Sequence, residues 1–317
     1  MKTLAIEASG PLTTVQDAGR YGFQDKGVPV SGAMDRAALE LGNRLLGNNA
    51  RAAALEIFSG GFRARFLKEA FFAVTGFDPE VRLNGRGIDL WTSHTAQAGD
   101  VLSIDAGSLG LWHYLCLAGG IHVPFVLGSR STYLRGHFGG LEGRTLRPGD
   151  VLETDPGGPQ KPSGRIPESL RPPYAAHPTV RAVPGPQAEA FCPEAFDAFF
   201  SAPYRVTTRS DRMGMMLDGP RLKHRGAADI VSEGLAFGAV QVPGEGLPFV
   251  LLADCPTTGG YAKIATVLSL DLPLLVQTAP GRSLRFQAVD LLEAREAHLK
   301  RGYKIRRFFH LLRQGGP

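Results

Sequence analysis

Glycine and proline interrupt this chain so often that little room is left for long helices. The 317 residues include 40 glycines and 23 prolines, which separate short runs of apolar and β-branched side chains. Glycine and proline favour turns, and short runs at such spacing are typical of β-sandwiches and β-barrels. We therefore predict an all-β fold. The expected strands are 70–74, 112–117, 180–183, 204–208, 249–253 and 262–268.

Few segments are expected to be helical. The segment 35–46 begins at Asp35, which is suited to cap a helix, and ends before Gly47, which is suited to the conformation that follows a helix. The segment 193–200 is the second. The third is the C-terminal tail 291–317, where leucine and phenylalanine alternate with charges in a pattern that fits one or two amphipathic helical turns.

The chain is long enough for two domains. With 317 residues and 43% hydrophobic content, it can bury a sizeable core. The stretch 156–178 is rich in proline, glycine and serine and is the natural linker. We place an N-terminal domain at 1–160, the linker at 161–178, a C-terminal domain at 179–290 and a basic helical tail at 291–317. Each half has an apolar strand that leads into Gly-Gly, at 114–120 and 249–260, and similar turns occur at 98–102, 148–152 and 280–284. One interpretation is that the halves are distant copies of one unit; the alternative is that such turns recur in unrelated β proteins.

The positive charge is concentrated at the C-terminus. Residues 290–317 hold seven Lys or Arg and three Asp or Glu, which accounts for nearly all of the net charge of +5. The body shows no basic stripe interleaved with aromatic residues, so nucleic-acid binding is not expected. Two interpretations of the tail stay open: a solvated helix packed by one face, or a docking site for a partner protein.

Several chemistries lack their sequence signals. No apolar run approaches the ~20 residues that cross a bilayer, and the N-terminus has no signal peptide pattern, so we expect a cytoplasmic protein without membrane contact. Cys116, Cys192 and Cys255 form no CxxC pair, which argues against a disulfide framework and a zinc site. The chain has no GxxxxGK[ST], HExxH or GxSxG motif, so neither a standard ATP site nor a metal site is expected.

The segment 254–261, with the sequence DCPTTGGY, is the leading candidate for a ligand site. It follows the apolar run 248–253 and is expected to form a tight loop. Glycines let the backbone approach a ligand closely, while hydroxyls and N–H groups can hold an anion or a carbonyl. We assign catalytic roles to Asp254, Thr257, Thr258 and Tyr261, and ligand approach to Gly259 and Gly260. The alternative is a hairpin turn with incidental polar residues.

Other polar motifs supply candidates for substrate binding. Ser129, Arg130 and Ser131 could hold a carboxylate or phosphate, because a guanidinium offers two parallel donors and the hydroxyls add more. The alternative is a capped turn between strands. Ser210 and Arg212 precede Gly214 in an expected loop. A role in substrate binding and a role in forming the turn are equally supported for these two residues.

Two glutamines complete the candidate set. Gln241 and Gln277, expected on short β segments, could recognise an amide group through paired donor and acceptor contacts. Asp17 and Arg20 are interpreted as an ion pair that locks the N-terminal turn. His113, His122 and His137 are more readily interpreted as surface or core residues than as bases.

Short motifs rich in glycine and polar residues run through most of the chain. They are TTVQDAGRYGF (13–23), GV (27–28), SGAMD (31–35), NRLLGN (43–48), ALEI (54–57), YLCLAGGI (114–121), LGSRST (127–132), GGLEGR (139–144), SDRMG (210–214), SEG (232–234), QVP (241–243), TTGGY (257–261), Gln277 and PG (280–281). Together they resemble the family of the 5-oxoprolinase C subunit, also called the allophanate hydrolase subunit 2 or biotin-dependent carboxyltransferase-like family. The resemblance covers about residues 10 to 290.

The resemblance has implications for fold, activity and partners. It implies two cyclophilin-like β-barrel domains with a cleft between them, where ligands often bind. It also implies one component of an ATP-dependent 5-oxoprolinase that hydrolyses 5-oxo-L-proline to L-glutamate together with proteins like the A and B subunits of that enzyme. ATP would be used by the complex and not bound by this chain alone. In that scheme Thr257, Thr258 and Arg130 would stabilise developing negative charge, and Asp254 would orient or deprotonate the nucleophile.

Two other functions stay open under the same resemblance. One is a biotin-dependent carboxyltransferase that acts on a urea-like or amide acceptor; a separate biotin carrier would be needed, because the chain has no Ala-Met-Lys-Met-like attachment site. The other is a regulatory protein that binds a kinase-inhibitor-like partner. The chain also departs from the family pattern. Met215 and Met216 replace an aromatic residue and a cation, and Cys255 and Pro256 stand where the family has an Arg or Ala followed by Gln.

Overall fold

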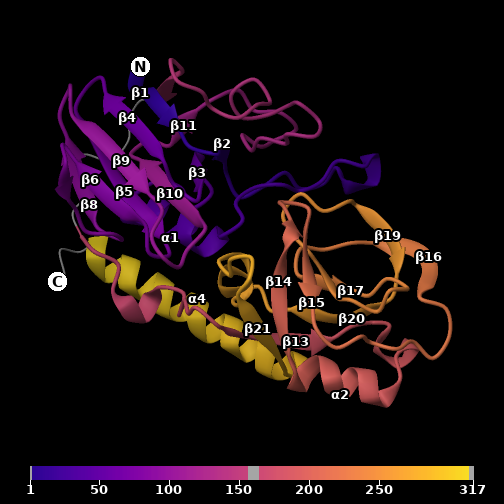
Figure 1. Cartoon of the computed structure of the whole chain (residues 1–317). Helices are drawn as coiled ribbons and strands as arrows, with labels where there is room; N and C mark the ends of the chain where they lie inside the picture. Colours follow the sequence, from indigo (N-terminus) through magenta and orange to yellow (C-terminus); the bar gives the residue numbers. More distant parts are fainter. Residues whose placement is uncertain (1, 156–163, 314–317) are drawn as a thin grey trace. The chain divides into compact units, whose positions relative to one another are not determined.

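The computed structural model describes residues 2–155 and 164–313 (Figure 1). Within them the chain is mostly β structure with four α-helices, one of them at the C-terminal end, which confirms the predicted fold class. The chain divides into two compact units. Unit 1 takes in Met1–Tyr21, Ser31–Arg171 and Ile305–Pro317, and unit 2 takes in Gly22–Val30 and Pro172–Lys304. Part of the expected linker, 161–163, lies outside the described residues.

Unit 1 contains two antiparallel sheets. The seven-stranded sheet has the order β11 (Ile121–His122), β12 (Val151–Thr154), β1 (Lys2–Ser9), β4 (Phe62–Phe66), β9 (Val101–Asp105), β6 (Glu80–Leu83), β7 (Arg86–Gly87). The five-stranded sheet has the order β2 (Leu12–Gln16), β3 (Ala54–Phe58), β10 (Trp112–Leu117), β5 (Ala70–Gly76), β8 (Ser93–Ala96). The strands expected at 70–74 and 112–117 are confirmed as β5 and β10.

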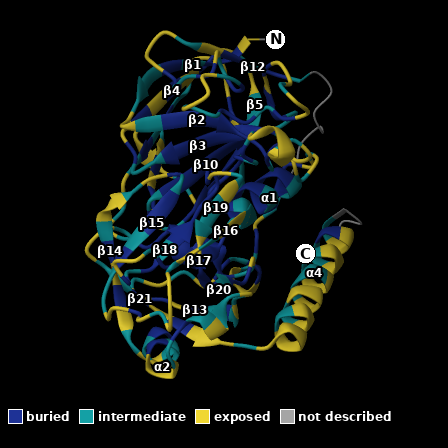
Figure 2. Ribbon diagram, turned by 90° about the vertical axis from the view of Figure 1, so that its right-hand side faces the viewer, coloured by how far each residue is buried: buried dark blue, intermediate teal, exposed yellow. Residues whose placement is uncertain are grey.

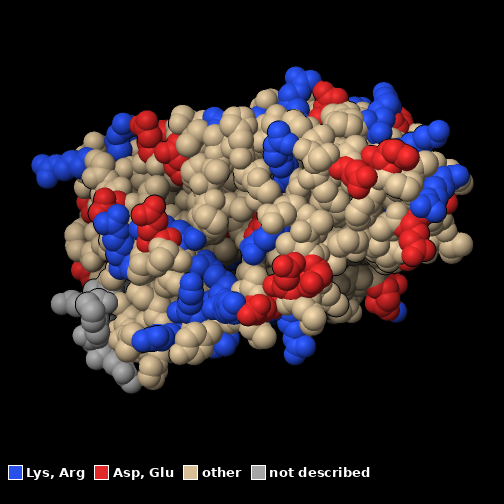
Figure 3. All heavy atoms as spheres, turned by 90° about the horizontal axis from the view of Figure 1, so that it is seen from below, with Lys and Arg blue, Asp and Glu red and all other residues tan. Residues whose placement is uncertain are grey.

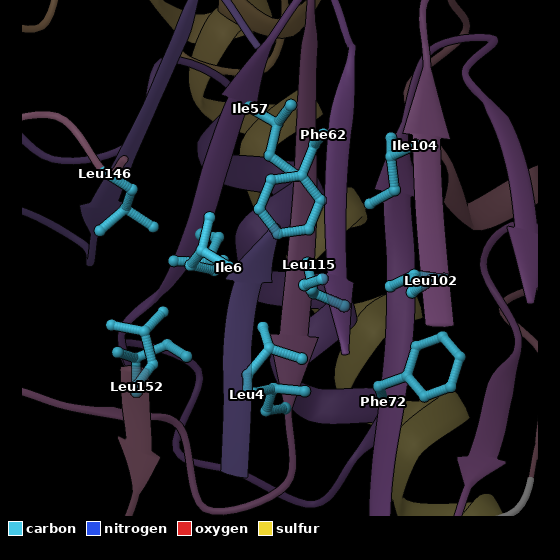
Figure 4. Close-up of a cluster of buried hydrophobic side chains, with 14 of the residues drawn as sticks. Leu4, Ile6, Ile57, Phe62, Phe72, Leu102, Ile104, Leu115, Leu146 and Leu152 are labelled. Carbon is cyan, nitrogen blue, oxygen red and sulfur yellow. The ribbon is translucent and has the colours of Figure 1, made fainter. Parts of the chain in front are cut away.

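Side chains from both sheets of unit 1 form one hydrophobic core. Burial alternates along β4, so that Phe62 and Phe66 are buried while Arg63 and Arg65 are exposed. Successive side chains of a strand point to opposite faces, which explains how this short sequence covers the core on one side only. Full burial of a side chain as large as Phe stabilises the fold by ~1.5–3 kcal/mol relative to exposure. Figure 4 shows the residues that meet there, among them Leu4, Ile6, Phe62, Leu102 and Ile104 of the seven-stranded sheet and Ile57, Phe72 and Leu115 of the five-stranded sheet.

Helix α1 (Arg36–Leu45) packs against β5 and β10. It begins where the side chain of Asp35 accepts a hydrogen bond of 2.9 Å from the backbone N–H of Ala38, as a capping residue does. It ends before Gly47, whose φ is +71°. The helix expected at 35–46 is therefore confirmed, together with the local signals that predicted its two ends.

A buried carboxylate ties the start of α1 to the sheet beneath it. Glu56 is 1% exposed, and its Oε2 accepts hydrogen bonds from Tyr114 Oη at 2.6 Å and from the backbone N–H of Met34 at 2.7 Å. Tyr114 Oη in turn accepts one from the N–H of Asp35 at 2.7 Å. Burial, with the nearby charge of Glu56, raises the pKa of Tyr114 well above its usual value. Three motifs far apart in the sequence thus converge in one buried network.

Unit 2 is built on a closed seven-stranded barrel. Its order is β13 (Thr179–Pro184), β20 (Lys263–Val267), β17 (Ala239–Gln241), β18 (Phe249–Leu251), β15 (Gly214–Asp218), β14 (Pro203–Ser210), β21 (Ser283–Ala288). β13 and β21 pair in parallel, and the other neighbours pair antiparallel. Helix α2 (Pro193–Ser201) packs against β21, and the short helix α3 (Leu272–Val276) packs against β13. The strands expected at 180–183, 204–208, 249–253 and 262–268, and the helix at 193–200, are confirmed.

Unit 2 also has a two-stranded ribbon that is not part of the barrel sheet. It pairs β16 (Asp229–Gly234) with β19 (Thr258–Tyr261). The segment 254–261 was expected to be a loop, and that expectation is wrong for its second half, because Thr258–Tyr261 is a strand. The strand was not predicted because it contains two successive glycines, and glycine is rare in strands and common in turns.

One backbone turn occurs three times, before β9, β12 and β21. Each copy has a glycine in the left-handed region, with φ between +87° and +96°. In the first copy, the N–H of Gly99 donates to the carbonyl of Phe66 on the neighbouring strand β4, and the N–H of Phe66 donates back to the carbonyl of Asp100. The other two copies have the same two hydrogen bonds, and all six are 2.8–2.9 Å long. The pairs are Gly99 with Phe66, Gly149 with Ile6, and Gly281 with Val206. The sequence similarity of these turns therefore reflects one shared geometry in both units.

Helix α4 (Leu291–Arg313) is a single helix of 23 residues, longer than the one or two turns expected. Figure 2 shows it exposed over most of its length. Its cations belong to the basic C-terminal segment, and Figure 3, which looks at the molecule from below, shows Lys and Arg crowded on one part of that face. Among the described residues, no helix is both long enough and apolar enough to span a membrane.

Candidate functional site

Asp254 and Arg212 form a buried ion pair in unit 2. Arg212 Nε donates to Asp254 Oδ2 at 2.8 Å, and Arg212 Nη2 donates to Asp254 Oδ1 at 3.1 Å. Each side chain is only 7% exposed. The backbones also meet, because the N–H of Asp254 donates to the carbonyl of Arg212 at 2.8 Å. Asp254 is thus held in a fixed orientation by two charge-assisted hydrogen bonds, a geometry suited to positioning neighbouring groups.

The hydroxyl of Ser210 closes its own turn. Ser210 Oγ donates to the carbonyl of Thr207 at 2.9 Å at the end of β14. Next to it, the side chain of Asp211 accepts from the N–H groups of Met213 and Gly214 at 2.7 and 3.2 Å. These contacts shape the loop that presents Arg212 to Asp254.

The ribbon strand β19 lies against Gln241 of the barrel. Gln241 is 5% exposed, and its Nε2 donates to the carbonyl of Tyr261 at 3.3 Å. A Cβ atom at Gly259 would lie 2.8 Å from Leu235 Cδ1 and 3.1 Å from Gln241 Nε2. A larger residue would crowd these two side chains, so glycine favours the close approach of the two segments. The structure therefore brings Gln241 together with β19, whose remaining positions include Thr258, Gly260 and Tyr261.

The outer positions of this segment face solvent. Thr258 and Tyr261 are exposed, while Thr257 is half-buried, and its carbonyl accepts a hydrogen bond from the N–H of Leu235 at 3.0 Å. Tyr261 is 41% exposed. The two threonines and the tyrosine are therefore accessible to a small molecule.

Gln277 does not lie on a β segment as expected. It ends helix α3 as the C-cap residue and is 2% exposed. The sequence LPLLV before it is a short apolar run, and periodicity alone cannot tell a buried helix of that length from a strand. Gln277 therefore belongs to a helix end that packs on β13.

Two charged residues that sequence reasoning did not select lie beside Gln241. Lys263 is 5% exposed, and its Nζ pairs with Glu233 Oε1. Gln187 joins them, since its Nε2 donates to Glu233 Oε1 at 2.7 Å and its Oε1 accepts from the N–H of Lys263 at 3.2 Å. The hydrogen bonds from Lys263 and Gln187 lower the pKa of Glu233. Glu233 lies within the SEG motif at 232–234, and membership of that motif was the sequence signal that could have identified it as a site residue.

Ser129 and Ser131 of unit 1 are committed to Asp17. Both are fully buried, and both hydroxyls donate to Asp17 Oδ1, Ser129 at 2.7 Å. Asp17 Oδ2 also accepts from the backbone N–H of Arg130 at 2.7 Å. These contacts match the alternative of a capped turn, in which the serines build the loop around a carboxylate of the chain itself.

The guanidinium of Arg130 is engaged as well. Its Nη1 donates to Asp155 Oδ2 at 2.6 Å and to the carbonyl of Ile121 at 3.2 Å. His122 Nδ1 lies against the same Asp155 carboxylate, and the hydrogen bond from Arg130 is the main reason that the pKa of Asp155 is lowered. The exposed ring of Phe125 covers the guanidinium, 4.4 Å from its centre. Arg130 therefore already has an anionic partner.

His113 lies in the core of unit 1. His113 is fully buried in β10, and burial lowers its pKa to about 4, against the opposing effects of Asp78 and the backbone of Ser59. It is a neutral core residue at ordinary pH. Across 2–155 and 164–313, no group of three or more His, Cys, Asp or Glu side chains is placed to hold a metal ion.

Comparisons with known proteins reveal close relatives. Residues 26–288 match the family model described as carboxyltransferase domain, subdomain A and B. The 5-oxoprolinase C subunit of Escherichia coli is 40% identical over 296 residues, which cover 93% of this chain and 94% of that protein. The C subunit of the Haemophilus influenzae enzyme is 37% identical, with 92% of each chain covered.

A solved structure shares the same fold. The urea amidolyase of K. lactis matches with a TM-score of 0.91 and 31% identity. The match covers 97% of this chain but 20% of that one, so the present chain spans about a fifth of the length of this relative.

Proposed function

The chain belongs to the carboxyltransferase domain family, subdomains A and B, and from this membership we propose that it acts as one component of an ATP-dependent 5-oxoprolinase. Such an enzyme hydrolyses 5-oxo-L-proline to L-glutamate. The observation that carries the proposal is the similarity to the C subunit of that enzyme in E. coli, which extends over nearly the whole of both chains.

The proposed reaction needs coupling to ATP for a physical reason. An unactivated lactam is a poor electrophile, and its opening is uphill. Transfer of the terminal phosphoryl group of ATP to the amide oxygen activates the carbonyl carbon. One water adds to that carbon and the ring C–N bond breaks, which leaves an acyl phosphate; a second water hydrolyses the acyl phosphate to glutamate and phosphate. Negative charge develops on oxygen in these steps, so hydrogen-bond donors placed at that oxygen lower the barrier.

The groups around β19 are the ones we assign to this substrate. The buried amide of Gln241 recognises the lactam, Thr257 and Thr258 donate to developing charge, and Tyr261 covers the ligand. Gly259 and Gly260 let the strand come close. The Arg212 and Asp254 pair holds the turn before β19 in place, so that Asp254 acts by positioning. We assign Ser129 and Ser131 to the architecture of unit 1, because their hydroxyls already serve Asp17.

Partner proteins complete the proposed activity. The sequence contains no standard ATP-binding motif, so we assign ATP use to a complex with proteins like the A and B subunits of 5-oxoprolinase. The test is to measure glutamate and ADP formation from 5-oxoproline and ATP, with this chain alone and mixed with both partners. Turnover only in the mixture supports the proposal. A verified complex that forms no glutamate contradicts it.

A second function is supported by the name of the family model and by the urea amidolyase relative. In this alternative the chain accepts a carboxyl group from biotin on a separate carrier and passes it to a urea-like or amide acceptor. The discriminating measurement is the transfer of labelled carboxyl from carboxybiotin to urea by the assembled complex. Transfer to urea without glutamate formation from 5-oxoproline favours this alternative.

A further inference from the structure

Lys263 is a buried cation in the barrel wall of unit 2. It is 5% exposed, whereas lysine is almost never fully buried unless it is paired. Its partner, Glu233, has a side chain that is 41% exposed. The pair therefore joins an inner ammonium group to a carboxylate that reaches it from the solvent side. A dissolved carboxylate could approach the ammonium from the same direction.

The two members of the pair sit on elements of different rigidity. Lys263 belongs to β20, which is hydrogen-bonded to β13 on one side and β17 on the other. Glu233 belongs to the ribbon β16·β19, which forms no larger sheet within the described residues. An isolated two-stranded ribbon is marginally stable by itself. The ammonium is therefore fixed, while the carboxylate is carried by the more easily displaced element.

The pair lies next to the amide that we assign to the substrate. Gln241 and Lys263 are directly paired residues of β17 and β20. Glu233 is directly paired with Gly259, the residue at which an added Cβ atom would lie 3.1 Å from Gln241 Nε2. The barrel strands β17 and β20 thus set an amide and a cation side by side, next to the ribbon. This combination matches a molecule that carries a carboxylate next to an amide.

We propose that Lys263 binds the carboxylate of the substrate and that Glu233 occupies this position until the substrate replaces it. The proposal rests on the proposed function for the identity of the ligand, 5-oxo-L-proline, which carries a carboxylate beside its lactam. The exchange conserves charge, because one carboxylate takes the place of another on the same ammonium. A buried ammonium without a partner would be strongly destabilising, and the exchange avoids that state. Urea has no carboxylate and gains nothing from Lys263.

The test measures binding to the isolated, full-length chain, without ATP or partners. Calorimetric or NMR titration with 5-oxo-L-proline is compared with 2-pyrrolidinone, the same lactam without the carboxylate. Lys263→Met is expected to weaken 5-oxo-L-proline binding roughly tenfold or more, because a charge-assisted hydrogen bond is lost, and to leave 2-pyrrolidinone binding unchanged. Glu233→Gln is expected to tighten 5-oxo-L-proline binding severalfold, because the internal competitor is neutral.

Matched variants control for charge and for folding. Lys300→Met and Glu296→Gln alter an exposed pair of the same residue types on α4, with 2.6 Å between the charged atoms, and should leave both titrations unchanged. Lys263→Arg keeps the cation and should retain most of the binding, which separates loss of charge from loss of fold; circular dichroism verifies the fold of each variant.

Three results would overturn the proposal. They are unchanged 5-oxo-L-proline binding in a folded Lys263→Met variant, weaker binding in Glu233→Gln, and failure of the unchanged chain, alone and in the complex, to bind 5-oxo-L-proline. Failure of the proposed function looks different. In that case the complex forms no glutamate, although the isolated chain still binds carboxylates in a way that depends on Lys263.

Discussion

Arg212 donates two hydrogen bonds to Asp254 in the interior of unit 2, at 2.8 and 3.1 Å. Removal of one member of a buried pair leaves the other charge without compensation, which costs more than the pair itself contributes. A loss of activity on substitution of Asp254 therefore has two possible origins, chemistry and folding. Stability and turnover have to be measured on the same variants.

We expect Asp254→Ala to lower the free energy of unfolding by about 3–5 kcal/mol, because the buried guanidinium of Arg212 loses the carboxylate that accepts two of its hydrogen bonds. Urea denaturation of the isolated chain measures this value. The control is Asp218→Ala, which breaks the pair with Arg205 on the same barrel, where the two side chains are 48% and 61% exposed. That change should cost about 1 kcal/mol or less. If both variants lost the same free energy of unfolding, the buried pair would not be more important for stability than the exposed one.

Gly259→Ala should disturb the approach of the ribbon to the barrel. The new methyl group would lie 2.8 Å from Leu235 and 3.1 Å from the amide of Gln241, and such crowding costs about 1–3 kcal/mol. Turnover of the assembled complex should fall together with stability. Gly234→Ala, on the paired strand, has open space around the added atom and is the control. If Gly234→Ala impaired turnover as much, crowding at Gly259 would not be the cause.

The stability of the chain should depend on pH through His113. Its pKa is lowered to about 4 in the folded state by burial, against ~6.5 in an unfolded chain. Between these values the unfolded chain binds a proton that the folded chain does not, so stability falls as the pH drops from about 6.5 to 4. The loss from this residue amounts to ~3 kcal/mol.

Thermal unfolding across that pH range measures the effect. His113→Leu should flatten the profile between pH ~4 and ~6.5, whereas the exposed His298→Gln should not change it. An unaltered slope in His113→Leu would assign the acid sensitivity to other groups.

Three exposed residues of α4 form one apolar stripe. Leu292, Leu299 and Tyr303 are 74%, 56% and 60% exposed, and their spacing of seven and four residues places them on one helical face. If this stripe docks a partner protein, the triple change to serine should leave the unfolding of the isolated chain within about 0.5 kcal/mol and weaken assembly with the A-like and B-like proteins. Leu67→Ser, at a residue that is 40% exposed in unit 1, is the control. Unimpaired assembly of the triple variant would leave α4 a solvated helix.

Local signals account for what could be predicted of the fold. The six predicted strands were visible as short apolar runs between turns, whereas strands such as β1, β4 and β9 were not predicted. Helix α1 was visible from Asp35 and Gly47, because capping and turn formation depend on neighbours in sequence. The ribbon strand β19 and helix α3 were missed. A Gly-Gly pair can form a turn or a strand, and a five-residue apolar run can form a strand or a helix, depending on the tertiary contacts around it.

The candidate site was less accessible to sequence reasoning. Gln241 and the segment up to Tyr261 do lie together, but the partners of the other polar residues come from distant positions. Asp17 takes the hydroxyls of residues more than a hundred positions away, and Lys263 pairs with a residue thirty positions before it. No spacing rule covers such pairs, because the sheet topology, which is non-local, brings them together.

The turn that recurs before β9, β12 and β21 can persist through evolution even when the sequence around it changes. Its hydrogen bonds join backbone groups only, so selection can replace every side chain around the glycine without loss of the geometry. A duplicated ancestral gene would keep such a feature after most of its sequence identity had drifted away. The three turns are then equivalent in backbone geometry. Placing the sequence of residues 148–150 at 280–282 amounts to Arg282→Asp, because both segments begin with Pro-Gly, and should yield a chain that folds.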